Sequence, residues 1–186
     1  MHTDKHAPAY PPINSRAVTE VVSFLDRERL MSIGVNRPDG WPQVTTMGYV
    51  NDGLDLYFVT ARESQKLANL ATDSRISLAI HSDGMTDGPS GLVMSGHAHE
   101  VSDADDIRAL SAVMSARWPD FSVYCPTSRS QAVVRFRPQV ICVTRSDKSQ
   151  SANAYFSVCE QTGDAVDHVH PPRSDATLKR PASLAL

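Results

Sequence analysis

The sequence predicts a mainly β protein with flanking helices, in which the strands form an antiparallel barrel. Segments rich in β-branched and aromatic residues are separated by tight-turn signals, of which Asn51-Asp52-Gly53 is the strongest. Such short turns join antiparallel neighbours, because parallel pairing needs a long crossover. Helical patterns are few and do not alternate regularly with the strands. A two-sheet sandwich is the competing architecture.

Length and composition indicate an ordinary globular domain. The chain has 186 residues, of which 41% are hydrophobic and 21% are charged, enough for one domain with a substantial core. Its net charge of -3 provides no general attraction to nucleic acid or anionic membranes. No apolar run approaches the roughly 20 residues needed to span a bilayer. We therefore expect no nucleic-acid partner and no membrane partner.

The three cysteines, Cys125, Cys142 and Cys159, are widely separated and contain no CxxC pair. This pattern indicates neither a disulfide framework nor a zinc site, and it fits reduced thiols. The N-terminal residues lack the apolar core of an export signal. We expect a cytoplasmic protein without a metal site.

The first 14 residues contain three prolines and are expected to form an extended arm. Asn14 or Ser15 can then cap a first helix. One face of this helix is expected to pack on a core, because its apolar residues recur at helical spacing: Val18, Val21, Val22 and Leu25.

Three strands are predicted next, over residues 30–35, 43–50 and 54–60. Turn signals at 37–40 and 51–53 separate them. Because both connections are short, we expect the three strands to form an antiparallel meander.

A helix capped by Ser64 is predicted to run to about residue 72. Strands are expected at 75–80 and 92–101, the second with a kink at Gly96.

Ser102 and Asp105 resemble a capping box, which predicts another helix that stops before Trp118. Its apolar residues are Ile107, Leu110, Val113 and Met114. One or two last strands are predicted around Pro138. The chain therefore divides into an extended arm (1–14), one barrel domain (15–146) and a polar C-terminal extension (147–186) without a core-forming repeat.

The turn after the third strand indicates a possible anion site. Ser64 can accept a hydrogen bond from a free first-turn amide, but Lys66 falls in the same turn, where a cation opposes the helix dipole. A bound anion, for which phosphate is the usual candidate, would explain this lysine. The alternative is a plain capped helix with a solvated lysine, and the motif alone does not decide between them.

His97 and His99 are separated by one residue, so on a strand both side chains point to the same face. Two imidazoles at this spacing can bind a metal or haem, but no third ligand is assignable nearby. We interpret them as hydrogen-bonded surface histidines.

Taken together, these elements resemble the pyridoxamine-phosphate-oxidase-like flavoproteins, which are FMN-binding split β-barrels of six antiparallel strands. The resemblance covers roughly residues 17–145. It rests on five segments in the family's order: the leading helix, the strand at 43–49, YFVTARESQKLANL, DSRISLAI and LVMSGHAHEVSD.

The resemblance implies a homodimer with FMN bound in a groove between the subunits. One strand is implied to line the isoalloxazine and ribityl chain, through Gln43, Val44, Thr45, Thr46 and Met47. Val59 and Thr60 are implied near the ribityl chain or phosphate, and Ser64, Gln65 and Lys66 are implied as phosphate ligands.

Departures from the family pattern bear on the activity. Family members often carry an arginine in place of Gln65, and Arg62 is our candidate for the missing charge. The segment 137–143 lacks the tryptophan of the authentic oxidase, and we find no downstream arginine and histidine of the kind that grip its substrate. Pyridoxamine phosphate is therefore not the expected substrate.

The leading hypothesis is a cytoplasmic, homodimeric FMN-dependent oxidoreductase that acts on a small-molecule substrate or electron donor, with unidentified catalytic residues. A second hypothesis replaces FMN by a deazaflavin, because QKLANLATDSRISL also resembles that branch. A third is a non-catalytic protein that binds flavin or haem, or senses redox state.

Overall fold

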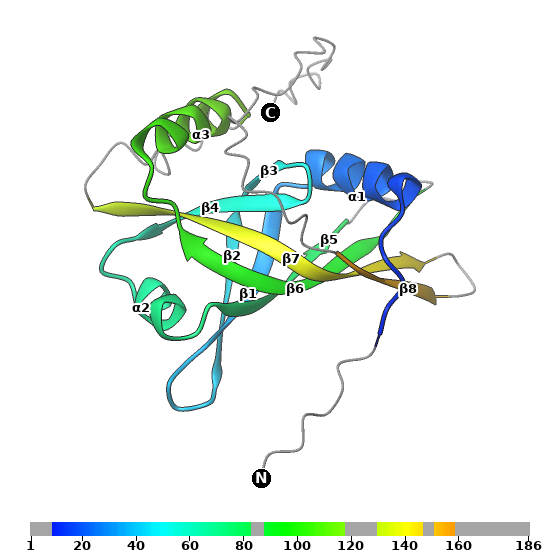
Figure 1. The fold of residues 1–186 in the computed structure, drawn as a ribbon, viewed down its shortest axis with the longest axis horizontal. Helices are drawn as coiled ribbons and strands as arrows, with labels where there is room; N and C mark the ends of the chain where they lie inside the picture. The colour runs from blue at the N-terminus through cyan, green and yellow to red at the C-terminus, as the bar shows by residue number, and fades with distance from the viewer. Residues whose placement is uncertain (1–8, 83–87, 118–129, 147–150, 159–186) are drawn as a thin grey trace, which may run out of the picture.

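The computed structural model describes residues 9–82, 88–117, 130–146 and 151–158 (Figure 1). The described residues form three helices: α1 (Ser15–Arg27), α2 (Gln65–Thr72) and α3 (Ala104–Arg117). They also form eight strands: β1 (Leu30–Asn36), β2 (Pro42–Gly48), β3 (Val50–Asp52), β4 (Asp55–Ala61), β5 (Arg75–His81), β6 (Gly91–Glu100), β7 (Gln131–Ser146) and β8 (Ser151–Ser157). None of the helices described combines the length and hydrophobicity that a membrane-spanning helix requires.

The strands form a single curled sheet with the order β2-β1-β5-β6-β7-β4-β3, and β8 is added to β7. All strand pairs are antiparallel. The two ends of this order, β2 and β3, are consecutive in the chain and are joined only by Tyr49. The sheet must therefore curl until its ends meet, which confirms the predicted antiparallel split barrel and excludes a two-sheet sandwich.

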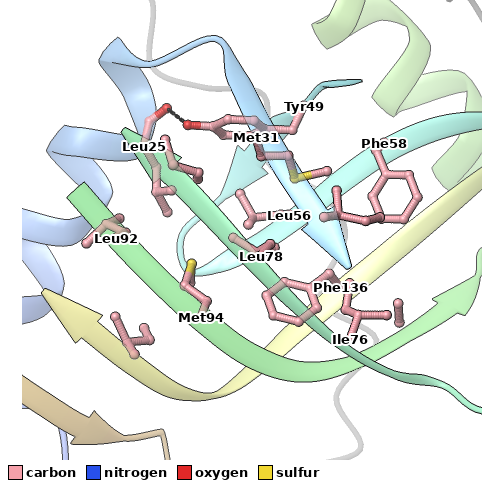
Figure 2. Packing of buried hydrophobic residues seen from close by; sticks show 14 of the residues in the cluster. Leu25, Met31, Tyr49, Leu56, Phe58, Ile76, Leu78, Leu92, Met94 and Phe136 are labelled. Carbon is pink, nitrogen blue, oxygen red and sulfur yellow. Dashed lines mark hydrogen bonds between the residues drawn. The ribbon is translucent and has the colours of Figure 1, made fainter. Parts of the chain in front are cut away.

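The main core lies inside the curled sheet, under α1 (Figure 2). Tyr49 is 1% exposed, and its hydroxyl donates a hydrogen bond of 3.0 Å to the carbonyl oxygen of Leu25 in α1. This hydrogen bond connects Tyr49, at the junction of β2 and β3, to α1. The surrounding side chains are apolar and fully buried, and they include Met31, Leu56, Phe58, Met94 and Phe136.

Side chains of alternate residues place the other two helices on different sides of the sheet. In β4, Leu56 and Phe58 face the main core, whereas Tyr57 and Val59 face a second cluster with Leu110 of α3. Leu70 of α2 belongs to the main core. Figure 1 accordingly shows α2 on the opposite side of the strands from α3.

The predicted meander is only half correct. β1 and β2 form the expected hairpin, and β3 and β4 form a second one. β2 does not pair with β4, however, because the predicted 43–50 strand divides at Tyr49 and sends its two halves to opposite ends of the sheet. Turn length specifies which strands are antiparallel neighbours locally, but it does not detect a strand that changes partners.

The described residues contain two strands more than the predicted six. One is β3, produced by the division at Tyr49, and the other is β8, which lies in the extension, where no core-forming repeat was found. The backbone of Ser157 in β8 bonds to Pro11 and Ile13, so residues 9–14 run extended beside β8. Residues 1–8, 147–150 and 159–186 of the arm and the extension lie outside the described residues, as do Cys125 and Cys159. Cys142, on β7, is buried and free.

Two helix caps show where local prediction succeeds and fails. Asn14 caps α1 as predicted, with its side chain accepting from the amide of Ala17 at 2.9 Å. In α3 the predicted cap, Ser102, is wrong. Asp103 accepts from the amides of Asp105 and Asp106 at 2.9 and 3.0 Å. A carboxylate one residue later can satisfy two free amides, which makes it the better cap.

The buried stripe of α1 differs in part from the prediction. Val21 and Leu25 are buried as expected, but the other buried residues are Ala17 and Phe24 rather than Val18 and Val22. The apolar stripe of α3 is confirmed, since Leu110 is buried and its predicted neighbours pack against the second cluster.

Gly96 marks the predicted kink in β6, where the register with β7 shifts between Ser95 and Gly96. A Cβ atom at this position would lie 2.0 Å from the carbonyl oxygen of Arg137, so only glycine permits this approach of the two strands. β7 is one continuous strand through Pro138, which settles the choice between one and two last strands.

Candidate functional site

The turn between β4 and α2 has the predicted strand–cap–helix structure. Ser64 is the N-cap of α2, and its hydroxyl oxygen accepts from the amide of Leu67 at 3.2 Å. The amides of Gln65 and Lys66 belong to the first turn, whose N–H groups have no carbonyl partner within the helix. They remain available as donors at this end of α2.

Lys66 is not solvated, so the alternative of a plain helix with a solvated lysine is wrong. The residue is only 7% exposed. Its Nζ lies 3.4 Å from the sulfur of Met47 on β2, and no carboxylate among the described residues forms a salt bridge with it. Burial lowers the pKa of the Lys66 ammonium from its ordinary value. Burial of a cation costs free energy when its only polar neighbour is a weak acceptor such as a thioether. A bound anion would offset this cost.

Two hydroxyl groups lie at the same end of α2. The Oγ1 atom of Thr60, at the end of β4, is 3.0 Å from the Oγ atom of Ser64. Thr60 is 8% exposed and Ser64 is half-buried. Together with Lys66 and the free amides, these groups form a set of hydrogen-bond donors suited to an oxyanion.

A chain of side-chain amides connects α2 to β2. Asn69 is 1% exposed, accepts from Gln65 Nε2 at 2.9 Å and donates to Gln43 Oε1 at 3.3 Å. We call the cluster formed by Gln43, Met47, Thr60, Ser64, Gln65, Lys66 and Asn69 the junction site. Sequence reasoning missed Asn69, although its spacing from Lys66 and Leu70 places it on the buried stripe of the helix.

The other residues predicted on β2 divide between its two faces. Thr45 alternates with Gln43 and Met47 and therefore shares the face that meets α2. Val44 and Thr46 are exposed on the opposite face, where Thr46 Oγ1 lies 3.1 Å from Ser32 Oγ. The structure thus brings three of the five β2 residues towards the junction site.

Val59 and Arg62 lie apart from the junction site. Val59 packs in the second cluster, on the face of β4 that is covered by α3. The guanidinium of Arg62 forms a 2.8 Å ion pair with Glu100 and bonds to the carbonyl oxygen of Gln131. Its charge is therefore already compensated.

His97 and His99 lie on one face of β6, as predicted. Their rings are stacked with centroids 6.3 Å apart, and Nδ1 of His97 lies 2.8 Å from the hydroxyl of Ser74. Among the residues described, no group of three or more His, Cys, Asp or Glu side chains could hold a metal ion.

The geometry defines a class of protein: an antiparallel split barrel with a cluster of hydrogen-bond donors at the junction between a strand end and a helix start. The model of the pyridoxamine 5'-phosphate oxidase family matches residues 17–145. The chain belongs to the pyridoxamine 5'-phosphate oxidase family. None of the curated proteins is significantly similar to it in sequence.

Solved structures share the fold. A putative pyridoxamine 5'-phosphate oxidase from Listeria innocua is 18% identical, with a TM-score of 0.57 over 68% of this chain and 96% of that one. The haem storage protein HutZ from Vibrio cholerae is 15% identical, with a TM-score of 0.57 over 67% and 92%. An F420 reductase is 24% identical, with a TM-score of 0.51 over 64% and 93%. At these identities the similarity shows the fold and not the function.

Proposed function

We propose that the junction site binds the phosphate of FMN and that the protein is a cytoplasmic FMN-dependent oxidoreductase. The observation that carries this proposal is Lys66, a buried ammonium in the first turn of a helix with no carboxylate partner among the described residues. A phosphate dianion would supply the missing negative charge. The hydroxyls of Thr60 and Ser64 and the first-turn amides would complete its hydrogen bonds.

The chain's own residues would hold and orient the cofactor. Lys66 and Ser64 would bind the phosphate, while the face of β2 that carries Gln43, Thr45 and Met47 would lie along the rest of the molecule. FMN would supply hydride transfer, for which the protein provides binding, orientation and electrostatics. Family membership and the predicted contacts support this arrangement.

The direct test is to purify the protein, record its visible absorption spectrum and identify any released chromophore by mass spectrometry. We expect a yellow protein containing FMN, and tight binding of added FMN by the apoprotein. Colourless protein that also fails to bind added FMN contradicts the proposal. Arg108→Gln, which alters an exposed charge on α3, is a control that should bind FMN as the wild type does.

A deazaflavin is the second candidate cofactor, because the same donors fit its phosphate and because the F420 reductase shares the fold. Gln65 brings no charge where family members often carry an arginine, so charge alone does not separate the two cofactors. Parallel titrations with FMN and a deazaflavin decide between them. If the deazaflavin binds more tightly than FMN, the deazaflavin is the cofactor and the FMN proposal is contradicted.

A non-catalytic flavin- or haem-binding protein is the third candidate. The stacked histidines support haem as a possible ligand, because His97 Nδ1 bonds to the Ser74 hydroxyl. In the tautomer in which Nδ1 donates to that hydroxyl, Nε2 is free to act as a ligand. Reduction of the bound flavin by NADH or NADPH would support the oxidoreductase. Stoichiometric haem binding without flavin reduction would support the alternative.

We also propose that the protein is a homodimer with the cofactor near the subunit interface. Apolar side chains are exposed on the outward face of the sheet: Leu30 (50%) on β1, Val44 (68%) on β2 and Val93 (46%) on β6. A hollow of about 340 Å³ lies on the same face and is lined by small residues that include Gly34, Ser77 and Ser95. Exposed apolar side chains on one face of a sheet are a common feature of protein interfaces.

A further inference from the structure

Asn69 occupies an unusual position, because a fully buried amide links the two parts of the junction site. It accepts a hydrogen bond from Gln65, in the first turn of α2, and donates one to Gln43, on β2. Gln65 is exposed and Gln43 is half-buried, so neither side chain is closed off from a ligand. Gln43 and Gln65 are therefore joined through Asn69.

A chain of three amides has two consistent arrangements. Each amide presents one acceptor oxygen and one NH₂ donor group. If a single amide turned by 180°, two oxygens or two NH₂ groups would face each other, and at least one of the two part-buried hydrogen bonds would be lost. If all three turned together, both hydrogen bonds would be kept. The orientation of Gln65 therefore determines the orientation of Gln43.

We propose that the Gln43–Asn69–Gln65 chain couples phosphate binding to recognition of the ring end of the ligand. This inference rests on the proposed function. In this scheme the phosphate lies on the side of Gln65 that now presents its amide oxygen, since the NH₂ group faces Asn69. Because the oxygens of a phosphate dianion only accept hydrogen bonds, a phosphate bound there turns the NH₂ group of Gln65 towards itself. The oxygen of Gln65 then accepts from Asn69, and the oxygen of Asn69 accepts from Gln43.

The result is an outward-facing acceptor at Gln43. In the arrangement of the structure, Gln43 uses its oxygen for Asn69 and presents its NH₂ group outwards. With phosphate bound, it presents its oxygen instead. The coupled site selects a phosphate monoester whose heterocycle offers an N–H group to β2. Asn69 is a positioning residue in this scheme, because it acts only through Gln43 and Gln65.

A double-mutant cycle tests the coupling. We expect Gln43→Leu and Gln65→Leu each to weaken FMN binding, and their combined effect to differ from the product of the single effects by at least about threefold, a size typical of residues in one hydrogen-bond network. In an Asn69→Leu background the effects should multiply. Multiplicative effects in the wild-type background, or unchanged coupling in the Asn69→Leu background, overturn the proposal.

A second measurement needs neither a flavin nor the stability of Asn69→Leu. Inorganic phosphate is titrated into the wild-type protein while the NMR signals of the side-chain NH₂ groups are followed. We expect the signals of Gln65, Asn69 and Gln43 to shift with one common midpoint. A shift of Gln65 alone, or no shift of the three signals, overturns the coupling.

The two tests separate failure of the coupling from failure of the proposed function. FMN binding without a common shift of the three signals would support the proposed function and contradict the coupling. A common shift with phosphate in a protein that binds no FMN would support the coupling and contradict FMN as the cofactor. Thr72→Ala, in the last turn of α2 and away from the amide chain, is the control for general effects on the helix and should leave both readouts unchanged.

Discussion

Lys66, the residue proposed to bind the phosphate, is unfavourable for folding of the ligand-free protein. Its ammonium is buried beside the Met47 thioether, and no anion among the described residues compensates its charge. Burial of a charge costs free energy, so the ligand-free protein is less stable than it would be with an apolar residue there. Binding residues commonly carry such a cost.

Replacing Lys66 by methionine should therefore stabilise the ligand-free protein while weakening FMN binding. We expect Lys66→Met to raise the free energy of unfolding by about 1 kcal/mol, because a side chain of similar length without charge fills the same space. Urea unfolding and FMN titration measure the two effects. A variant that is destabilised, or that binds FMN as the wild type does, contradicts this account.

The lowered pKa of Lys66 predicts opposite effects of alkaline pH on stability and on binding. Between the lowered folded-state pKa and the ordinary value, the unfolded chain holds a proton that the folded chain has released. The stability of the ligand-free protein therefore rises with pH in this window. FMN affinity falls in the same window, because phosphate binds the charged ammonium.

Thermal unfolding and FMN titration across the alkaline range test this prediction. Lys66→Met should remove both slopes, and riboflavin, which lacks the phosphate, should show no corresponding loss of affinity. Slopes of the same sign would show that another group controls the pH dependence.

At the scale of single helices and strands, the cap of α3 predicts different effects for substitutions at the neighbouring residues Ser102 and Asp103. Asp103→Ala should lower the free energy of unfolding by about 1 kcal/mol, because the amides of Asp105 and Asp106 would lose their acceptor. Ser102→Ala should have little effect, and it is the matched control one residue away. Chemical denaturation of both variants checks the prediction. Equal losses in the free energy of unfolding would contradict the assignment of Asp103 as the cap.

The bulge of β6 gives a second prediction at this scale. Gly96→Ala should destabilise the protein by about 1–3 kcal/mol, because the added methyl group would meet the backbone of Arg137 and Pro138. Gly34→Ala is the control, since its Cβ atom would lie 3.6 Å from the carbonyl oxygen of Ser77, an ordinary contact distance. Comparable melting temperatures for the two variants would contradict the close approach.

At the scale of the whole molecule, we expect Val44→Lys to convert the proposed dimer into a monomer. Val44 is exposed on the outward face of β2, and a charge there opposes burial of this face in an interface. Light scattering coupled to size-exclusion chromatography measures the mass, and FMN affinity should fall with dissociation. Ala116→Lys, exposed on α3, is the control. If the Val44→Lys protein remains dimeric, the dimer interface does not lie on this face of β2.

The candidate site could be predicted in part from the sequence. Ser64 and Lys66 were found because a cap and a misplaced cation are local features of consecutive residues. Asn69 was missed because its role depends on Gln43, which lies 26 positions away in the chain and on another element. Val59 carried no local sign that its side chain faces α3, since that depends on which face of β4 is covered.

Local sequence features were sufficient to predict the antiparallel character of the sheet, the positions of most helices and strands, and the kink at Gly96. These features follow from turn chemistry, periodicity and backbone sterics within a few residues. The folded structure was needed to show that β2 and β3 close the barrel around Tyr49, that β8 extends the sheet, and that the Lys66 ammonium is buried. Each of these depends on contacts between distant segments, whose free energy is gained only once the whole sheet has formed.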